Sequence, residues 1–267
     1  MSARIVVLDS VTQCQGRVQL GDVVVAGSFA GALSLGLALP FGIRALIAHA
    51  AGVGKDEAGI SALPAAERLG LPAAAVETMS ARIGDGSSVH DDGVISHVNA
   101  MATALGVRIG MSAREAAHLI IRASEPRVIG DAGLVDHTCY VVDEAQAGRV
   151  VCLDTLAFAD AGNARDVLCA GSHGGRVNVD ALLRIVKPRG VIASDGGMAK
   201  DRSGASGLAM LDDAGVAGAT VSAWSARIGD ARSSWGDGVI SAMNARAARL
   251  GVAVGQPART AARHILD

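Results

Sequence analysis

Short apolar runs rich in β-branched residues recur along the chain, separated by longer stretches with helical periodicity. The runs show little alternation of apolar and polar positions, which is typical of parallel strands covered on both faces. Two helical stretches, 59–69 and 204–214, are followed by Gly70 and Gly215, residues suited to the end of a helix. Strands that alternate with helices predict a mainly parallel α/β sheet with right-handed crossovers. The expected strands are Arg4–Asp9, Asp22–Ala26, Arg44–His49, Ala73–Glu77, Arg149–Asp154, Asp166–Ala170, Gly190–Ser194 and Ala219–Ser222.

The second half of the chain repeats the first, with an offset of 145 residues in its best-matched part. The run Ser80–Asp85 returns as Ser225–Asp230, and residues 78–110 share 19 identities in 33 positions with residues 223–255. A repeat of this length indicates a duplicated domain, because solenoid repeats are about 20–50 residues long. The sequence therefore predicts two tandem homologous Rossmann-like lobes with mainly parallel sheets, related by a pseudo-two-fold axis. The expected parts are a first repeat at 1–121, a connector at 122–148 with an extra strand at His137–Glu144, and a second repeat at 149–267.

Composition and charge narrow the classes of partner. Half of the 267 residues are hydrophobic and only 2% are aromatic, so aliphatic side chains have to fill the core. The formal net charge is −2 and no basic patch is interleaved with aromatic residues, which argues against nucleic acid as a partner. Mean hydropathy is +0.37, and the apolar surface that this implies predicts a homo-oligomer.

One segment looks like a membrane span, but its counterpart in the second repeat does not. Residues 23–43 carry no charge, whereas residues 167–191 carry five charged side chains. A duplicated fold would not span a membrane in one half only, so we expect a buried strand and helix at 23–43 and no membrane association. The segment is also a candidate oligomer surface.

The cysteine pattern and the start of the chain indicate a cytoplasmic protein. The four cysteines, at positions 14, 139, 152 and 169, show no C-x-x-C spacing, so we expect reduced packing residues rather than disulfides. No signal peptide is visible at the start of the chain. No G-x-G-x-x-G follows an expected strand, which disfavours a dinucleotide, and we expect no cofactor.

Candidate chemistry collects at the carboxyl ends of the expected strands, where open parallel sheets bind their ligands. Ser28 and Ser172 each lie in a small-x-Ser-x-small sequence between an expected strand and helix. The pattern is similar to a nucleophile elbow, although Ala replaces the first Gly in both repeats. The alternatives are a ligand contact and a helix N-cap.

A lysine follows the third expected strand of each repeat within a Gly-rich turn. Lys55 and Lys200 could neutralise an anion, or act as a base if burial lowers the lysine pKa. The alternative is a surface lysine paired with the next residue, Asp56 or Asp201.

The fourth expected strand leads into the best-repeated motif. Its arginine, carboxylate and hydroxyl groups could grip a carboxylate, amide or phosphate before a helix that opens near Asp92 or Asp237. The alternative is a structural ion pair within the turn. These candidate substrate-binding residues are Arg82, Asp85 and Ser88 in the first repeat and Arg227, Asp230 and Ser233 in the second.

The two repeats differ most at their strand ends, where the second repeat is the more polar. His173 and Asp195 stand where the first repeat has Phe29 and Ala50. They could assist catalysis, or bind a metal; no ligand-spaced His pair accompanies them, so we expect no metal site.

Together these patterns predict a hydrolase that cleaves an amide, lactam or ester bond of a small, anionic or polar substrate. Ser172 would attack with Lys200 as base, His173 and Asp195 would assist, and Ser28 and Lys55 would join the Arg, Asp and Ser residues in substrate binding. Two alternatives stay open: a non-catalytic protein that binds a small anion or metabolite, and a lyase or isomerase that uses a lysine base.

Overall fold

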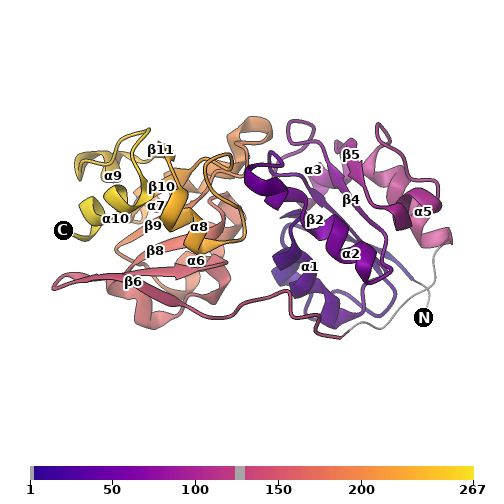
Figure 1. The fold of residues 1–267 in the computed structure, drawn as a ribbon, viewed down its shortest axis with the longest axis horizontal. Coiled ribbons are helices and arrows are strands. Elements are labelled where there is room, and N and C mark those ends of the chain that lie inside the picture. Colours follow the sequence, from indigo (N-terminus) through magenta and orange to yellow (C-terminus); the bar gives the residue numbers. More distant parts are fainter. Residues whose placement is uncertain (1–2, 124–129) are drawn as a thin grey trace. The chain divides into compact units, whose positions relative to one another are not determined.

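The structure is a computed structural model that describes residues 3–123 and 130–267. It is a mixed α/β chain with two mostly parallel sheets, which confirms the expected class (Figure 1). The chain divides into two compact units: unit 1 is Met1–Val53, Glu57–Val135 and Ala199–Asp201, and unit 2 is Gly54–Asp56, Asp136–Met198 and Arg202–Asp267. Each unit therefore contains three residues from the other half of the chain. The expected repeat boundaries stay a prediction, and residues 124–129 of the connector lie outside the described residues.

Unit 1 is built on a five-stranded sheet in the order β1-β2-β3-β4-β5. The first four strands are parallel, and β5 pairs antiparallel with β4. The strands are β1 (Ile5–Leu8), β2 (Val23–Phe29), β3 (Ala45–His49), β4 (Ala73–Val76) and β5 (Ile95–Val98). The α-helices are α1 (Ala32–Ala38), α2 (Ala62–Arg68), α3 (Gly86–Asp91), α4 (Ala100–Ala104) and α5 (Ala113–Ala123).

Both faces of this sheet are covered, as the nearly continuous apolar strands require. Leu33 is buried in α1, and Leu63 of α2 packs with Leu46 on one face. Ile120 of α5 packs with Ile47 on the other face. Alternate residues of each strand thus enter two separate hydrophobic cores.

Unit 2 has a six-stranded sheet in the order β11-β10-β9-β8-β7-β6. Strands β7 to β10 are parallel, while β6 and β11 pair antiparallel at the two edges. The strands are β6 (Tyr140–Ala145), β7 (Gly148–Leu153), β8 (Val167–His173), β9 (Gly190–Ser194), β10 (Ala217–Val221) and β11 (Ile240–Met243). The α-helices are α6 (Arg176–Ile185), α7 (Gly207–Asp213), α8 (Ala231–Asp237), α9 (Ala245–Arg249) and α10 (Ala258–Leu266).

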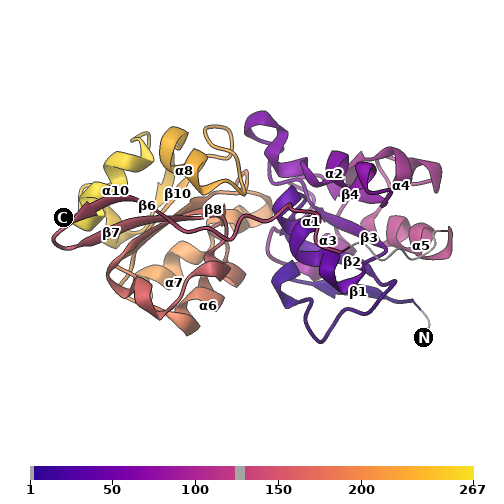
Figure 2. The same ribbon diagram turned by 60° about the horizontal axis from the view of Figure 1, so that its bottom comes forward.

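The helices of unit 2 also cover both faces of its sheet. Figure 2 shows α8 and α10 on one face and α6 and α7 on the other. Ile265 of α10 packs with Ile192 in the first of these cores, and Leu182 of α6 packs with Leu168 in the second. The expected extra strand is confirmed as β6, which begins at Tyr140.

Short 3-10 helices occupy several connections. They are η1 (Val11–Gln13), η2 (Leu39–Phe41), η3 (Lys55–Ile60), η4 (Leu156–Phe158), η5 (Ala161–Arg165) and η6 (Lys200–Ala205). The expected helix ends at Gly70 and Gly215 are confirmed, because these glycines have φ of 69° and 74° and donate back to Glu67 and Asp212.

The expectation of a helix opening near Asp92 and Asp237 is wrong. Those residues lie at the ends of α3 and α8, which start at Gly86 and Ala231 because Asp85 and Asp230 cap them. Each capping carboxylate accepts the backbone N–H three residues later, from Ser88 or Ser233, at 2.9 Å. Strands β5 and β11, which follow these helices and pair antiparallel at the sheet edges, were not predicted from the sequence.

Two asparagines at corresponding positions begin short helices. Asn99 and Asn244 are the N-caps of α4 and α9. The Asn99 amide also donates to the Leu71 carbonyl at 2.8 Å, and its oxygen accepts the N–H of Ala73. The Asn99 side chain therefore ties the chain before β4 to the start of α4.

The uncharged segment 23–43 forms β2 and α1, both largely buried, as expected. Among the residues that the structure describes, no helix is long and apolar enough to cross a membrane.

A glycine in the second parallel strand of each unit, Gly27 in β2 and Gly171 in β8, lets two loops pack closely against that strand. In unit 2, a Cβ on Gly171 would lie 2.6 Å from the Asp230 nitrogen and 2.9 Å from the Asp154 oxygen. The Gly229 N–H donates to the Gly171 carbonyl at 2.8 Å. Gly27 holds the same kind of position in unit 1, against Asp85 and Asp9. These close approaches bring the repeated Arg-Ile-Gly-Asp turn onto the carboxyl end of the sheet.

Candidate functional site

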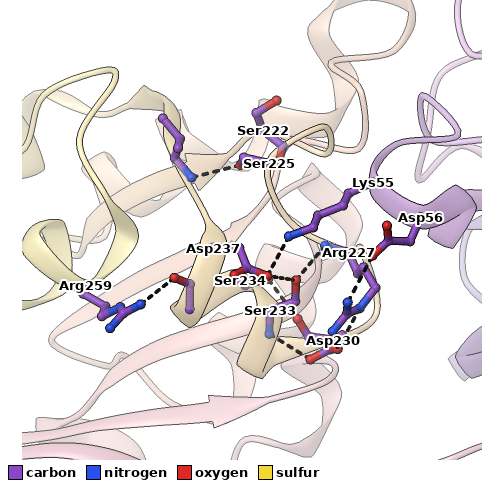
Figure 3. A network of polar contacts seen from close by, with 12 residues as sticks. Lys55, Asp56, Ser222, Ser225, Arg227, Asp230, Ser233, Ser234, Asp237 and Arg259 are labelled. Atoms are coloured by element: carbon purple, nitrogen blue, oxygen red, sulfur yellow. Dashed lines mark hydrogen bonds and ion pairs between the residues drawn. The ribbon is translucent and has the colours of Figure 1, made fainter.

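A network of polar side chains lies at the carboxyl ends of the strands of unit 2 (Figure 3). At its centre, Oδ2 of Asp237 accepts from Lys55 Nζ at 2.8 Å and from Ser233 Oγ at 2.9 Å. The Ser233 hydroxyl in turn accepts the backbone N–H of Arg227 at 3.0 Å. One carboxylate therefore links the lysine of residues 54–56 to helix α8 and to the turn before it.

The arginine of the same network is held by two carboxylates. Nη2 of Arg227 lies 2.8 Å from Oδ2 of Asp230, and Nη1 lies 3.1 Å from Oδ2 of Asp56. The other oxygen of Asp230 caps α8. Figure 3 shows Lys55 and Asp56 reaching different members of this network.

Unit 1 contains a network of the same composition. Lys200 Nζ lies 3.2 Å from Oδ2 of Asp92, which also accepts from Ser88 Oγ at 3.0 Å. Arg82 donates to Asp85 at 3.0 Å and to Asp201 at 3.1 Å. Each lysine loop thus supplies one cation and one carboxylate to a repeated Ser, Arg and Asp turn.

These contacts show how the charged groups of the two motifs are paired. The arginine and aspartate of each repeated turn do form an ion pair. Neither lysine is paired with its neighbouring Asp; each is paired with the aspartate that ends a short helix.

Hydrogen bonds from Lys55 and Ser233 lower the pKa of Asp237, and those from Lys200 and Ser88 lower the pKa of Asp92. A carboxyl whose pKa is depressed in the folded state adds stability above its unfolded pKa, and this stability is lost as the pH falls through the folded value. The hydrogen bonds of Asp92 and Asp237 with the two lysines therefore add stability near neutral pH, and this contribution is lost in acid.

The backbone that carries the two lysines is strained. Every non-glycine residue with positive φ among the described residues lies in one of two loops that follow β3 and β9. Left-handed backbone costs roughly 1–2 kcal/mol for each residue other than glycine, and it is least suited to a β-branched residue such as Val53. These residues and their φ angles are Ala51 (51°), Val53 (59°), Asp56 (53°), Glu57 (55°), Met198 (63°), Ala199 (57°), Asp201 (57°) and Arg202 (55°).

The two candidate serines lie within strands rather than on exposed turns. Ser172 is 3% exposed in β8, and its Oγ accepts the Leu156 N–H at 3.1 Å. Ser28 is likewise buried in β2 and accepts the Val11 N–H at 3.0 Å. The N-cap alternative is wrong, since α1 and α6 have glycine N-caps; the strands run on to residues 29 and 173 through an irregular register.

His173 and Asp195 lie at neighbouring strand ends of unit 2, and both are buried. Nδ1 of His173 accepts the Gly175 N–H at 3.1 Å, so this nitrogen does not carry the proton. Oδ1 of Asp195 accepts the N–H groups of Gly197 and Ala223, both at 2.9 Å. Of the four expected catalytic residues, Ser172, His173 and Asp195 belong to unit 2, whereas Lys200 belongs to unit 1.

Asp154 is a further polar group of unit 2, outside the expected catalytic and substrate-binding residues. It follows β7, and its Oδ1 accepts the first N–H of α8, from Ala231, at 2.9 Å. Burial raises the pKa of Asp154, as does repulsion from Asp230 and Asp136. The constant offset that pairs it with Asp9, whose Oδ1 accepts the N–H of Gly86, was the available signal.

No group of three or more His, Cys, Asp or Glu residues in the described part of the chain is placed to hold a metal ion. Comparison with known proteins finds no matching family model, no matching curated protein and no matching solved structure.

Replacing Arg202 with glycine should raise the free energy of unfolding by about 0.5–1 kcal/mol, because glycine relieves the left-handed strain. Arg122→Gly is the matched control, since Arg122 is equally exposed but lies in helix α5. That change should cost about 1 kcal/mol. Urea unfolding of both variants measures the difference, and equal destabilisation would contradict a strained loop.

Acid should destabilise unit 1 through His49, which precedes its strained loop. Nδ1 of His49 accepts the Ala51 N–H, while Nε2 donates to the carbonyls of Thr78 and Ala81. Burial lowers the pKa of His49 to about 4. Between pH 6.5 and 4 the unfolded chain binds the proton more tightly, so stability should fall by up to about 3 kcal/mol on acidification.

The control for this pH effect is His49→Ser. Ser194, the counterpart of His49, accepts the Gly196 N–H in the same way without an imidazole. The variant should be less stable near neutral pH, because two hydrogen bonds are lost, but its unfolding free energy should vary less between pH 6.5 and 4. An unchanged slope in denaturation curves across this range would exclude His49 as the cause.

Proposed function

We propose that each of the two lysine loops of this chain binds a small polar molecule within its own unit. The observation that carries the proposal is the confinement of all non-glycine left-handed residues, among those described, to these loops. Strain of this kind persists only where the surrounding structure imposes it, and it gathers at ligand sites. The loops follow the carboxyl ends of parallel strands, the usual ligand position in open α/β sheets.

The repeated composition of the two networks also supports the proposal. The same five polar contacts occur around Lys55 in unit 2 and around Lys200 in unit 1. In each network the lysine and a serine donate to one aspartate, the arginine side chain donates to two others, and the arginine backbone N–H donates to the serine hydroxyl. We propose that the two repeats arose by duplication and that each kept a binding loop. Unit 2, which also contains His173 and Asp195, is then the more specialised of the two units. A homo-oligomeric state and a cytoplasmic location stay predictions.

Hydrolysis of an amide, lactam or ester by Ser172 is the second candidate. It is favoured by one observation: a buried serine, histidine and carboxylate lie at the adjoining ends of β8 and β9. The hydrogen bond from Leu156 to Ser172 Oγ argues against a free nucleophile, because it occupies a lone pair on the attacking oxygen. A lyase or isomerase with a lysine base is less well supported, since both lysines are paired with carboxylates.

A thermal-shift screen of small amides, esters and carboxylates, followed by calorimetry of the hits, tests the binding proposal. The chain has three lysines, so Lys187→Met is a matched control for Lys55→Met and Lys200→Met. Lys55→Met or Lys200→Met removes a charge-assisted hydrogen bond to the ligand, so at least one of these two variants should bind it about 10-fold or more weakly. Lys187→Met should bind these molecules as tightly as the wild type does. The proposal would be contradicted if neither Lys55→Met nor Lys200→Met changed the affinity for them.

A fluorophosphonate probe separates the second candidate from the first. Binding alone predicts no adduct on folded protein, whereas an adduct on Ser172 that is lost in Ser172→Ala would move the assignment to hydrolysis. Ser28→Ala is the matched control for that variant, because Ser28 is buried in the same way.

A further inference from the structure

Each unit exposes a large, polarisable side chain in the loop that follows its last parallel strand. Trp224, which follows β10, is 68% exposed, and Met79, at the same offset after β4, is 59% exposed. The chain has two tryptophans, and the other, Trp235, packs against the core of unit 2. A single exposed apolar side chain is common, but this one recurs at the same position in both repeats, which points to a use.

In unit 2 the exposed tryptophan belongs to a wider apolar surface. Val239 and Val254 are also exposed. The Val239 N–H donates to Oγ of Ser225, the residue after Trp224, at 2.9 Å. Gly255, the residue after Val254, donates to the carbonyl of Ile240. Three neighbouring loops therefore carry apolar side chains at this end of the unit.

The residue before Trp224 is in contact with the strained loop and with Asp195. The Ala223 carbonyl accepts the backbone N–H of Lys55 at 2.8 Å. A Cβ on Gly54 would lie 2.5 Å from the same carbonyl oxygen, so the loop backbone packs directly on Ala223. The Ala223 N–H donates to Asp195. Trp224 is thereby fixed next to the lysine loop of its own unit.

The charged side chains of this site carry a slight excess of negative charge. The two cations, Lys55 and Arg227, face three carboxylates, from Asp56, Asp230 and Asp237. A ligand anion would have to displace one of these carboxylates and would meet the remaining excess of negative charge. A neutral group that both donates and accepts hydrogen bonds can join the network without this cost.

We propose that unit 2 binds a flat, uncharged ring with amide-type donors and acceptors along its edge. The face of the ring lies on Trp224 and its polar edge meets the network around Lys55. This inference rests on the proposed function and names the ligand class of that site. Unit 1, with Met79 in place of the tryptophan, provides an apolar but non-aromatic surface.

Three matched probes test the proposal on the whole chain: benzamide, which is flat and neutral; benzoate, which is flat and anionic; and cyclohexanecarboxamide, which is neutral and not flat. Ligand-observed NMR gives their affinities without depending on tryptophan. Benzamide should bind about 4-fold more tightly than benzoate, the penalty of like charges about 5 Å apart in water. It should bind about 2- to 10-fold more tightly than the saturated amide, from aromatic contact.

Variants locate the site and separate the two proposals. Trp224→Met, which copies unit 1, should lower the affinity for benzamide about 2- to 10-fold and leave cyclohexanecarboxamide unchanged. Met79→Ala is the control and should have less effect on benzamide. Tighter binding of benzoate, equal binding of the two amides, or no binding of benzamide would overturn the inference. The screen with Lys55→Met would still support the proposed function if other polar molecules bind.

Discussion

The carboxylate of Asp237 holds the site of unit 2 together. One of its oxygens accepts from both Lys55 and Ser233, so it connects the strained loop to helix α8. The start of that helix is bonded to Asp154 at the end of β7, and the preceding turn is pressed onto Gly171 in β8. The loop, the helix and two strands are thus positioned through one short chain of polar contacts. Asp92 has the corresponding place in unit 1.

The magnitudes show that ion pairs alone do not hold the loops. The left-handed residues cost roughly 1–2 kcal/mol each, while partly exposed pairs such as Lys55–Asp237 contribute at most about 1 kcal/mol. The side chains of that pair are 31% and 43% exposed. Backbone contacts, such as the Lys55 N–H on the Ala223 carbonyl, and burial of Ala51 have to supply the rest. A loop with such a cost is understandable if a ligand needs its lysine in one place.

The sequence was sufficient for the fold class and for part of the site. Apolar runs located the parallel strands, and the offset of 145 residues identified Lys55, Arg227 and Ser233, which the structure brings together in unit 2. It did not reveal that Ser172 lies inside a strand, because Ala-Gly-Ser reads equally well as a turn, and only the irregular pairing of β8 carries the strand on to His173. The edge strands β5 and β11 were missed because Asp92 and Asp237 resemble helix caps but end helices.

Amine modification followed by mass spectrometry tests most directly whether these carboxylates hold the two loop lysines. Lys187 is exposed and serves as the reference within the same molecule. The account predicts that Lys55 and Lys200 react more slowly than Lys187 in the folded protein. It also predicts that Asp237→Asn accelerates modification of Lys55 alone, and Asp92→Asn that of Lys200 alone. Equal rates for all three lysines, or a rate at Lys55 that Asp237→Asn leaves unchanged, would contradict it.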